Sequence, residues 1–353
     1  MRSVPGRLAV VLAGAGVAVL AMLVGAPPAL AHGGGGGAAT NWLSEVVSVR
    51  PAMAGVSVRL PDAGTVEVVS SSGRPVTVLG YDGEPYLRIA PSGVEENTLS
   101  PAAYLNRTSD GRTALPAGVD ARAAPRWVRV AGGPAYRWHD HRTHWMSATL
   151  PPGVAAEPGA RELVAEWTVG LRYGDVPVMV SGRLWWVPGP AVWPWGVLVL
   201  VLAGLGWLVA GLAAWRVWVV GLLGVLVGAT VMHVVGARGA GSVGGVVLGL
   251  VPVVVAWGVA GAAAWAVVRQ RPSAGWGVVL TGALLGVLAG LADVGELTHS
   301  QVAFAGPGWV ARLCVAVAMG LGLGLVLCGW RLLRWEQRLP GARSAETVVG
   351  GVG

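Results

Sequence analysis

The stretch VWPWGVLVLVLAGLGWLVAGLA, residues 192–213, carries no charged side chain along its whole length. A helix needs about 20 consecutive apolar residues to cross the hydrocarbon core of a bilayer, so this stretch predicts a transmembrane span. The pattern recurs along the rest of the chain, and residues 191–335 are expected to form an α-helical transmembrane domain of five spans. The predicted spans lie at about 192–213, 217–236, 245–268, 276–292 and 309–330.

The composition agrees with a membrane protein. Of the 353 residues, 54% are hydrophobic and only 12% are charged, whereas soluble domains carry roughly 25% charged residues. The formal net charge is +7, but the segment 32–191 contains 14 Arg and 14 acidic residues and is neutral. The excess lies in the N-terminus and the membrane part, so nucleic acid is not an expected partner. No phosphate-binding loop of the GxxxxGKS or GxxxxGKT form occurs, so no nucleotide is expected either.

The distribution of arginine predicts how the spans are oriented. If the residues before 191 lie outside, the inner loops hold seven arginines and the outer loops hold two, as the positive-inside rule requires. The expected location is the cytoplasmic membrane, with the lipid bilayer as partner and a cytoplasmic tail over 336–353. The inner arginines are Arg216, Arg269, Arg271, Arg331, Arg334, Arg338 and Arg343, and the outer ones are Arg238 and Arg312.

Residues 1–31 have the three parts of a secretory signal peptide. Arg2 and Arg7 supply the positive region, an apolar core follows over 8–24, and Ala29-Leu30-Ala31 is a small-x-small cleavage site. We therefore expect the part that follows to be exported. An uncleaved anchor is the alternative interpretation.

Cleavage after Ala31 would make His32 the first residue, at the start of a Gly-rich linker over 32–41. A terminal histidine offers its α-amino nitrogen and its ring Nδ1 as a two-point chelate for copper. The alternative is that His32 merely adjoins a low-complexity linker.

Residues 42–190 predict an exported all-β sandwich, immunoglobulin-like or cupredoxin-like. Many short alternating runs are separated by turn signals such as Asp82-Gly83 and Gly174-Asp175, which is typical of such folds. Residues 91–125 are rich in Pro, Ala and Arg and predict a long loop. The expected strands lie within 45–49, 56–60, 65–69, 76–79, 86–89, 127–130, 163–169, 176–180 and 183–187.

Residues 138–145 read WHDHRTHW and contain three of the six histidines. Neutral imidazole is the commonest metal ligand among side chains. On a strand, His139 and His141 would point to the same face, and His144 would join them only if the chain turns. Asp140 is expected to orient a histidine or to pair with Arg137 or Arg142. The alternative is a set of packing residues between two tryptophans.

Two further features bear on this cluster. Met146 adds a thioether, which suits Cu(I). The two cysteines, Cys314 and Cys328, both lie in the last apolar segment, so the exported part has no disulfide and no thiolate ligand. A metal site there must use imidazole and oxygen ligands.

The membrane part has its own polar groups at the predicted outer face. His233 lies near the end of the second span, and Asp293, Glu296 and His299 follow the fourth. Ionisable groups at membrane depth are costly and are functional candidates by default. We expect His233, Asp293 and His299 to form a metal relay or to be ordinary interfacial polarity. Glu296 is expected only to end a helix.

Three stretches of the exported part carry a resemblance: LGYDGEPYLR at 79–88, YLNR at 104–107 and WHDHRTHW at 138–145. With the order of signal peptide, β domain and spans, the chain resembles uncharacterised membrane proteins of actinobacteria, which implies no established activity. It is also loosely similar to exported copper-binding proteins of the CopC and methane-monooxygenase B-subunit kind. That likeness implies copper ligands at His32, His139 and His141.

These observations predict a membrane-anchored protein that binds and delivers a metal outside the membrane. Copper is the expected ion and zinc is the second choice, because imidazole suits both. Another envelope metalloprotein would receive the ion. No GxSxG or HExxH motif is present, and a non-enzymatic role is favoured. The alternatives are a metal-free structural or interaction protein of the envelope and, less favoured, a copper-dependent oxidase.

Overall fold

The computed structural model describes residues 39–62, 64–108, 113–237 and 243–336 of the chain. Two compact units are present, one over 40–189 and one that contains residues 190 onward. The predicted signal peptide, His32 and the tail beyond residue 336 lie outside the described residues.

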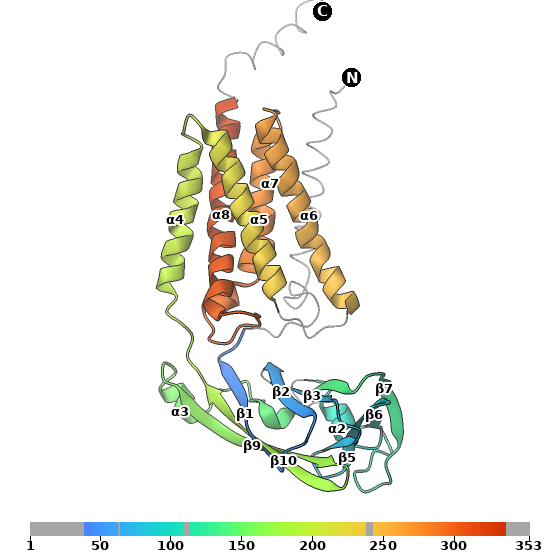
Figure 1. Ribbon diagram of the computed structural model, residues 1–353. Coiled ribbons are helices and arrows are strands. Elements are labelled where there is room, and N and C mark those ends of the chain that lie inside the picture. Colours follow the sequence, from blue (N-terminus) through green and yellow to red (C-terminus); the bar gives the residue numbers. More distant parts are fainter. Residues whose placement is uncertain (1–38, 63, 109–112, 238–242, 337–353) are drawn as a thin grey trace, which may run out of the picture. The chain divides into compact units, whose positions relative to one another are not determined.

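The first unit is an antiparallel β domain of ten strands (Figure 1). Eight of them lie where alternating runs predicted strands, with 176–180 and 183–187 merged into one long strand. Two strands, β6 and β8, had not been expected. The strands are β1 (Trp42–Arg50), β2 (Val56–Asp62), β3 (Thr65–Ser70), β4 (Val76–Leu79), β5 (Pro85–Ala90), β6 (Gly93–Asn97), β7 (Trp127–Ala131), β8 (Ala135–His139), β9 (Glu162–Tyr173) and β10 (Val176–Trp186).

The strands form two sheets that share one buried core. Seven strands pair in the order β1-β10-β9-β4-β5-β6-β7, and the other three in the order β2-β3-β8. Val66 and Val68 of β3 are buried in the same cluster as Leu87, Val169 and Val180 of the larger sheet. An immunoglobulin domain divides seven strands between two sheets, whereas seven strands form a single sheet here. The prediction of an all-β domain is confirmed, whereas neither an immunoglobulin nor a cupredoxin arrangement is confirmed by the strand order.

The prediction of a long loop over 91–125 is wrong in its first half. Gly93 has φ of +133°, which the missing side chain permits, and β6 pairs back on β5 from this residue. A short helix, α2 (Ala102–Leu105), follows. Hydropathy does not predict β6, because Glu95 and Glu96 interrupt its apolar residues and only part of the strand faces the core.

The second unit is helical. Its elements are α4 (Trp193–Val209), α5 (Trp215–Gly236), α6 (Val243–Val268), α7 (Ala274–Gly286), a π-helical turn η3 (Val287–Leu291), a 3-10 turn η4 (Val294–Leu297) and α8 (Gly308–Glu336). Four of these helices are long and apolar enough to cross a membrane, which makes contact with a bilayer their natural environment.

The prediction of five spans is corrected to four, because α4 is too short. It has 17 residues, or about 26 Å of helix, against the roughly 30 Å of a hydrocarbon core. The helix ends at Val209, and a turn begins at Gly211, whose amide donates to the Leu208 carbonyl at 2.9 Å. The turn consists of Gly, Leu and Ala. The sequence therefore stays apolar beyond the end of the helix, and the predicted span was too long.

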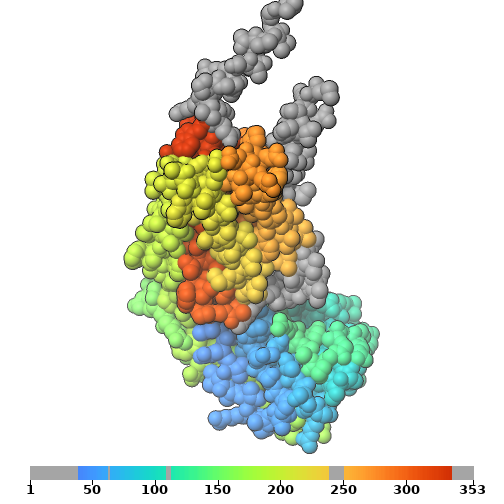
Figure 2. Space-filling view, turned by 45° about the horizontal axis from the view of Figure 1, so that its top comes forward, coloured from blue at the N-terminus to red at the C-terminus, as the bar shows by residue number. Residues whose placement is uncertain are grey.

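Glycine lets the helices approach closely. A Cβ added to Gly206 of α4 would lie 2.5 Å from the backbone of Gly324 in α8, and one added to Gly282 of α7 would lie 2.5 Å from the Gly322 carbonyl oxygen. Small residues at such contacts are typical of helices packed in a membrane. Helix α8 is the common neighbour, and Figure 2 shows yellow and orange helices covering most of its red surface on one face.

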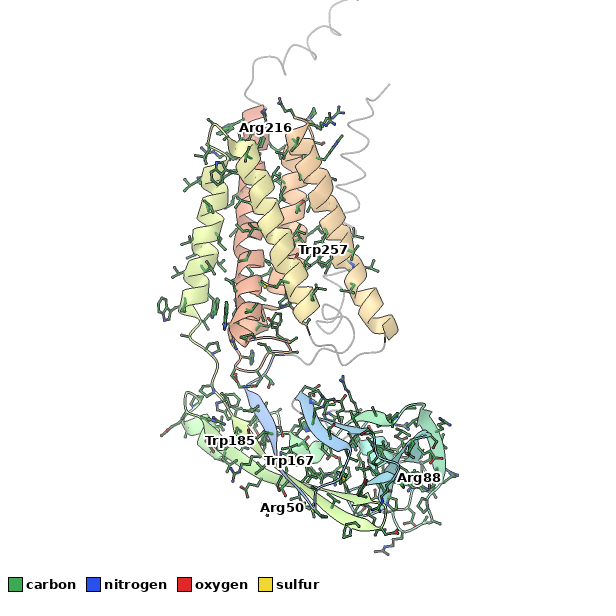
Figure 3. The ribbon with its side chains drawn as sticks, in the orientation of Figure 1. Arg50, Arg88, Trp167, Trp185, Arg216 and Trp257 are labelled. Atoms are coloured by element: carbon green, nitrogen blue, oxygen red, sulfur yellow. The ribbon has the colours of Figure 1, made fainter. Side chains whose placement is uncertain are left out.

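The two ends of the helical unit differ in charge. Arg216 starts α5 at one end (Figure 3), and Arg331 near the end of α8 donates to the Trp207 carbonyl at 3.2 Å. Midway along, Trp257 of α6 donates to Thr230 of α5 at 2.8 Å. His233, near the other end of α5, belongs to a different group of polar residues that is described below.

Candidate metal centre

The histidine cluster lies where β8 ends and the chain turns. His139 is the last residue of β8 and pairs with Thr65 of β3. Asp140 then caps a 3-10 turn, η2 (His141–Thr143), by accepting the Arg142 amide at 3.2 Å. The strand geometry expected for His139 and His141 is therefore absent, and the turn brings His144 back to His139.

The three imidazoles gather at one point. Nε2 of His139 lies 3.1 Å from Nε2 of His144. Each of the three rings offers a nitrogen, and these nitrogens lie within 4.8 Å of one another. Two nitrogens bound to one tetrahedral ion at about 2.0 Å are roughly 3.3 Å apart. The nitrogens of His139 and His144 are already close to this spacing. The His141 ring needs a shift on the order of 1 Å to join them.

One ring nitrogen of His141 donates a hydrogen bond, and the other is buried without a partner among the described residues. Its Nε2 contacts the Leu105 carbonyl oxygen at 2.8 Å, and because a carbonyl only accepts, Nε2 carries the proton. Nδ1 is then a bare lone pair, buried without a hydrogen-bond partner in the described part of the chain. A ring that donates one N–H to a carbonyl and presents the other nitrogen is the usual state of a metal-bound histidine.

Burial favours the neutral form of His139 and His144. It is the main cause that lowers the pKa of His144 to about 4, with the neighbouring His139 and His141 adding to it. Burial and then His141 also lower the pKa of His139 below its usual value. Neutral rings keep their lone pairs at pH 7, which is the state that a metal ion requires.

Asp140 supports the turn and contacts no imidazole. The carboxylate is fully buried and accepts from Trp138 Nε1 at 2.9 Å and from Arg142 Nη2 at 2.7 Å. Of the partners expected for Asp140, the structure shows Arg142, whereas Arg137 pairs with Glu67 at 2.6 Å. Asp140 thus fixes the backbone that carries the rings.

Two contacts come from distant parts of the chain that the sequence did not indicate. The Tyr81 hydroxyl accepts the His141 amide at 3.2 Å and donates to the Asn106 side-chain oxygen. Gly64 has φ of +102°, and a Cβ added there would lie 2.8 Å from Cε1 of His139 and 3.2 Å from Cγ of His144. A glycine before β3 therefore makes room for both rings.

Of the other residues expected at the site, Met146 is 46% exposed and belongs to no ligand group with the three histidines, and His32 lies outside the described residues. The tryptophans serve packing: Trp138 is buried, and Trp145 stacks on Trp42 with ring centroids 6.1 Å apart. The candidate metal centre is thus His139, His141 and His144, hereafter the histidine triad.

The helical unit holds a second polar cluster. His233, Asp293, Glu296 and Arg312 are all at least nine-tenths buried. Nε2 of His233 lies 3.0 Å from the Glu296 carboxylate and Nδ1 lies 3.6 Å from that of Asp293. The sequence predicts only a helix end at Glu296 and a loop charge at Arg312, because neither position carries a spacing signal.

His299 does not share the expected relay through its side chain. Its Nδ1 contacts the Gly295 carbonyl oxygen at 2.8 Å, and its own carbonyl accepts from Arg312 at 2.7 Å. Its contribution to the cluster is therefore made through the backbone.

Comparison of the chain with known protein families, curated proteins and solved structures finds no match. The likeness to actinobacterial membrane proteins and to exported copper-binding proteins thus stays a prediction.

Proposed function

We propose that this protein binds copper at the histidine triad of a β domain that its helical unit anchors in a membrane. The observation that carries the proposal is the convergence of three imidazoles whose nitrogens lie within 4.8 Å of one another. Three neutral imidazoles without a thiolate suit Cu and Zn, and Cu²⁺ is held more tightly than Zn²⁺ by a given set of nitrogen ligands.

The role proposed is binding and delivery to another envelope metalloprotein. Three ligands leave at least one coordination position of a four-coordinate ion open. An open position lets an incoming ligand attack before the ion leaves, and this favours transfer over storage. His32, if it is the first residue after cleavage, would be a fourth ligand from within the same chain.

The proposed orientation places the β domain outside the cytoplasmic membrane. Arg216, Arg331 and Arg334 lie at the end of the helical unit away from His233, as the direction of α5 and α8 requires. Cytoplasmic loops carry the excess of arginine. Although α4 is shorter than a full span, it packs beside α8 in the same direction, with Gly320 close to Val199 and Arg331 bonded to the Trp207 carbonyl. The first residue of α4 therefore lies at the end away from these arginines, and we place the residues before it on the extracytoplasmic side.

A copper-dependent oxidase is a second candidate, favoured by one observation. A cavity of about 390 Å³ adjoins the triad, and His139 is part of its lining together with Tyr86, Tyr136, Glu96 and Arg107. A substrate cleft beside an open metal position is what such chemistry requires. Consumption of oxygen by the copper-loaded protein in the presence of small phenols would favour this candidate over delivery.

The test is copper binding by the full chain in detergent, measured by competition with a chelator of known affinity. We expect His139→Ala combined with His144→Ala to abolish the tight binding, because the two rings hold the preformed pair. His299→Ala is the matched control, since its ring contacts backbone in the helical unit. Unchanged binding by the double variant would refute the site, and no binding by the native chain would favour a structural role.

A further inference from the structure

We infer that the helical unit contains a second cation site, in which Nε2 of His233 and the Glu296 carboxylate bind a divalent transition metal. Asp293 is the positioning residue. The inference is independent of the histidine triad, because it rests on residues of the other unit alone.

The geometry of the proposed ligand pair fits an ion. Nε2 of His233 and the Glu296 oxygen are 3.0 Å apart and share a hydrogen bond in the metal-free protein. An ion that replaced the shared proton needs two ligand atoms roughly 3.3 Å apart, so only a small shift is required. His233 is on α5, and Glu296 is in the turn after α7. Two elements far apart in the sequence therefore aim a nitrogen and an oxygen at the same point.

Asp293 and Phe304 fix the orientation of the His233 ring. The Asp293 carboxylate lies 3.6 Å from Nδ1, and the Phe304 ring stacks on the imidazole with centroids 6.2 Å apart. A carboxylate on one ring nitrogen and a metal on the other is a recurrent arrangement that orients the ring and raises its basicity as a ligand. In this protein, Asp293 lies on the Nδ1 side of the His233 ring and leaves Nε2 for the metal.

The charges of the cluster also favour a cation. Among the described residues, the cluster brings two carboxylates, one imidazole and one guanidinium together, in a unit made mainly of apolar helices. Ionisable groups at membrane depth mark ion pathways by default. A bound divalent cation would neutralise the carboxylates at the point where they converge.

The backbone around the site is held in place before any ion binds. Arg312 donates to one carbonyl oxygen of η4, that of Glu296 at 2.9 Å, and to two of the loop that follows, those of His299 at 2.7 Å and Ser300 at 3.0 Å. The π-helical turn over Val287–Leu291 immediately precedes the cluster, and such turns within helices are frequent at functional sites. The loop is thus fixed by hydrogen bonds that leave the His233 and Glu296 side chains facing each other.

The ligand set indicates what would bind and how firmly. Imidazole with carboxylate suits Cu²⁺ and Zn²⁺, and only two protein ligands leave most coordination positions open. The site therefore suits brief residence of an ion more than storage. This distinguishes it from the triad, where three nitrogens converge.

The test uses the full chain in detergent, loaded with Cu²⁺ alone and examined by electron paramagnetic resonance. The variant H32A/H139A/H141A/H144A removes the triad and the candidate terminal chelate. We expect it to retain one bound Cu²⁺ whose spectrum shows coupling to a single nitrogen. Adding His233→Gln or Glu296→Gln should remove that signal, whereas adding His299→Gln should leave it.

A milder variant guards against loss of folding. Asp293→Asn keeps the volume of the side chain and should lower Cu²⁺ affinity about 10- to 100-fold without removing the single-nitrogen coupling, as loss of an orienting partner does at other metal sites. Absence of bound Cu²⁺ from the four-histidine variant, or a signal that survives His233→Gln, would overturn the inference. Neither result would affect the signal of the triad in the native chain.

Discussion

At the scale of single residues, the triad depends on groups that never touch an ion. Gly64 leaves the space in which the rings of His139 and His144 meet, and Asp140 anchors the turn between them. The rings are thus placed by backbone conformation at Gly64 and by the buried carboxylate of Asp140. A substitution at either residue tests its contribution separately.

Gly64→Ala should weaken copper binding, because its Cβ would displace the His139 ring. Gly83→Ala is the matched control, since Gly83 also has a positive φ but has nothing within 4 Å of an added Cβ. Both variants should lose on the order of 1 kcal/mol of stability through backbone strain. Only Gly64→Ala should change the copper affinity in a chelator competition, and equal affinities for both variants would show that the ring contact is irrelevant.

Asp140→Asn should destabilise the β domain by about 3 kcal/mol, because it removes the carboxylate that pairs with the partly buried Arg142 guanidinium. Asp120→Asn is the control: that exposed carboxylate likewise accepts the amide two residues on, from Arg122 at 2.9 Å. Thermal unfolding followed by tryptophan fluorescence would measure both. A loss for Asp140→Asn no larger than for Asp120→Asn would refute the anchoring role.

The metal-free protein should become less stable as the pH falls from about 6.5 to about 4. The pKa of His144 is about 4 in the folded state and near 6.5 in an unfolded chain. The unfolded state therefore binds more protons within this window, which favours unfolding. His144→Gln should reduce this pH dependence of the unfolding temperature, and an identical pH dependence in the variant would contradict it.

At the scale of elements, the effect of a substitution within a helix depends more on packing contacts than on the helix propensity of the residue. Gly282 of α7 and Gly258 of α6 both lie inside helices, yet an added Cβ would meet the Gly322 carbonyl at the first position and open space at the second. The same substitution thus has opposite consequences at two glycines that look alike in the sequence.

Gly282→Ala should lower the unfolding temperature of the helical unit, because α7 and α8 must separate. Gly258→Ala should leave it unchanged or raise it, since alanine favours a helix by about 1 kcal/mol over glycine. Circular dichroism of the detergent-solubilised chain at the helical wavelength would compare the two. A higher unfolding temperature for Gly282→Ala would contradict the close contact.

Hydropathy and the alternation of apolar and polar residues predicted most helices and strands. They did not predict where every element ends or which elements contact one another. Strand β8 was missed because Ala, Arg and His interrupt its alternation, and α4 was drawn too long because its final turn is apolar. The triad was only partly predictable: Asp140 followed by Arg142 is a sequence that permits a capped turn, which would have brought His144 into the site. The roles of Gly64 and Tyr81 could not be predicted, because their contacts with the histidines join segments that are far apart in the sequence.

At the scale of the whole molecule, the chain combines a β domain with a unit of apolar helices. Each has its own cluster of polar side chains, half-buried in the β domain and buried in the helical unit. The triad gathers nitrogen ligands, whereas the cluster around His233 gathers carboxylates and one imidazole. The two clusters thus differ in the ligand atoms that they would offer to a metal ion.

The central claim is that three imidazoles hold one copper ion, and X-ray absorption of the full chain loaded with a single equivalent of copper tests it most directly. We predict three imidazole nitrogens at about 2.0 Å, with the imidazole scattering reduced in His141→Ala. A copper ion bound by sulfur, or an imidazole signal unchanged in His141→Ala, would contradict the account.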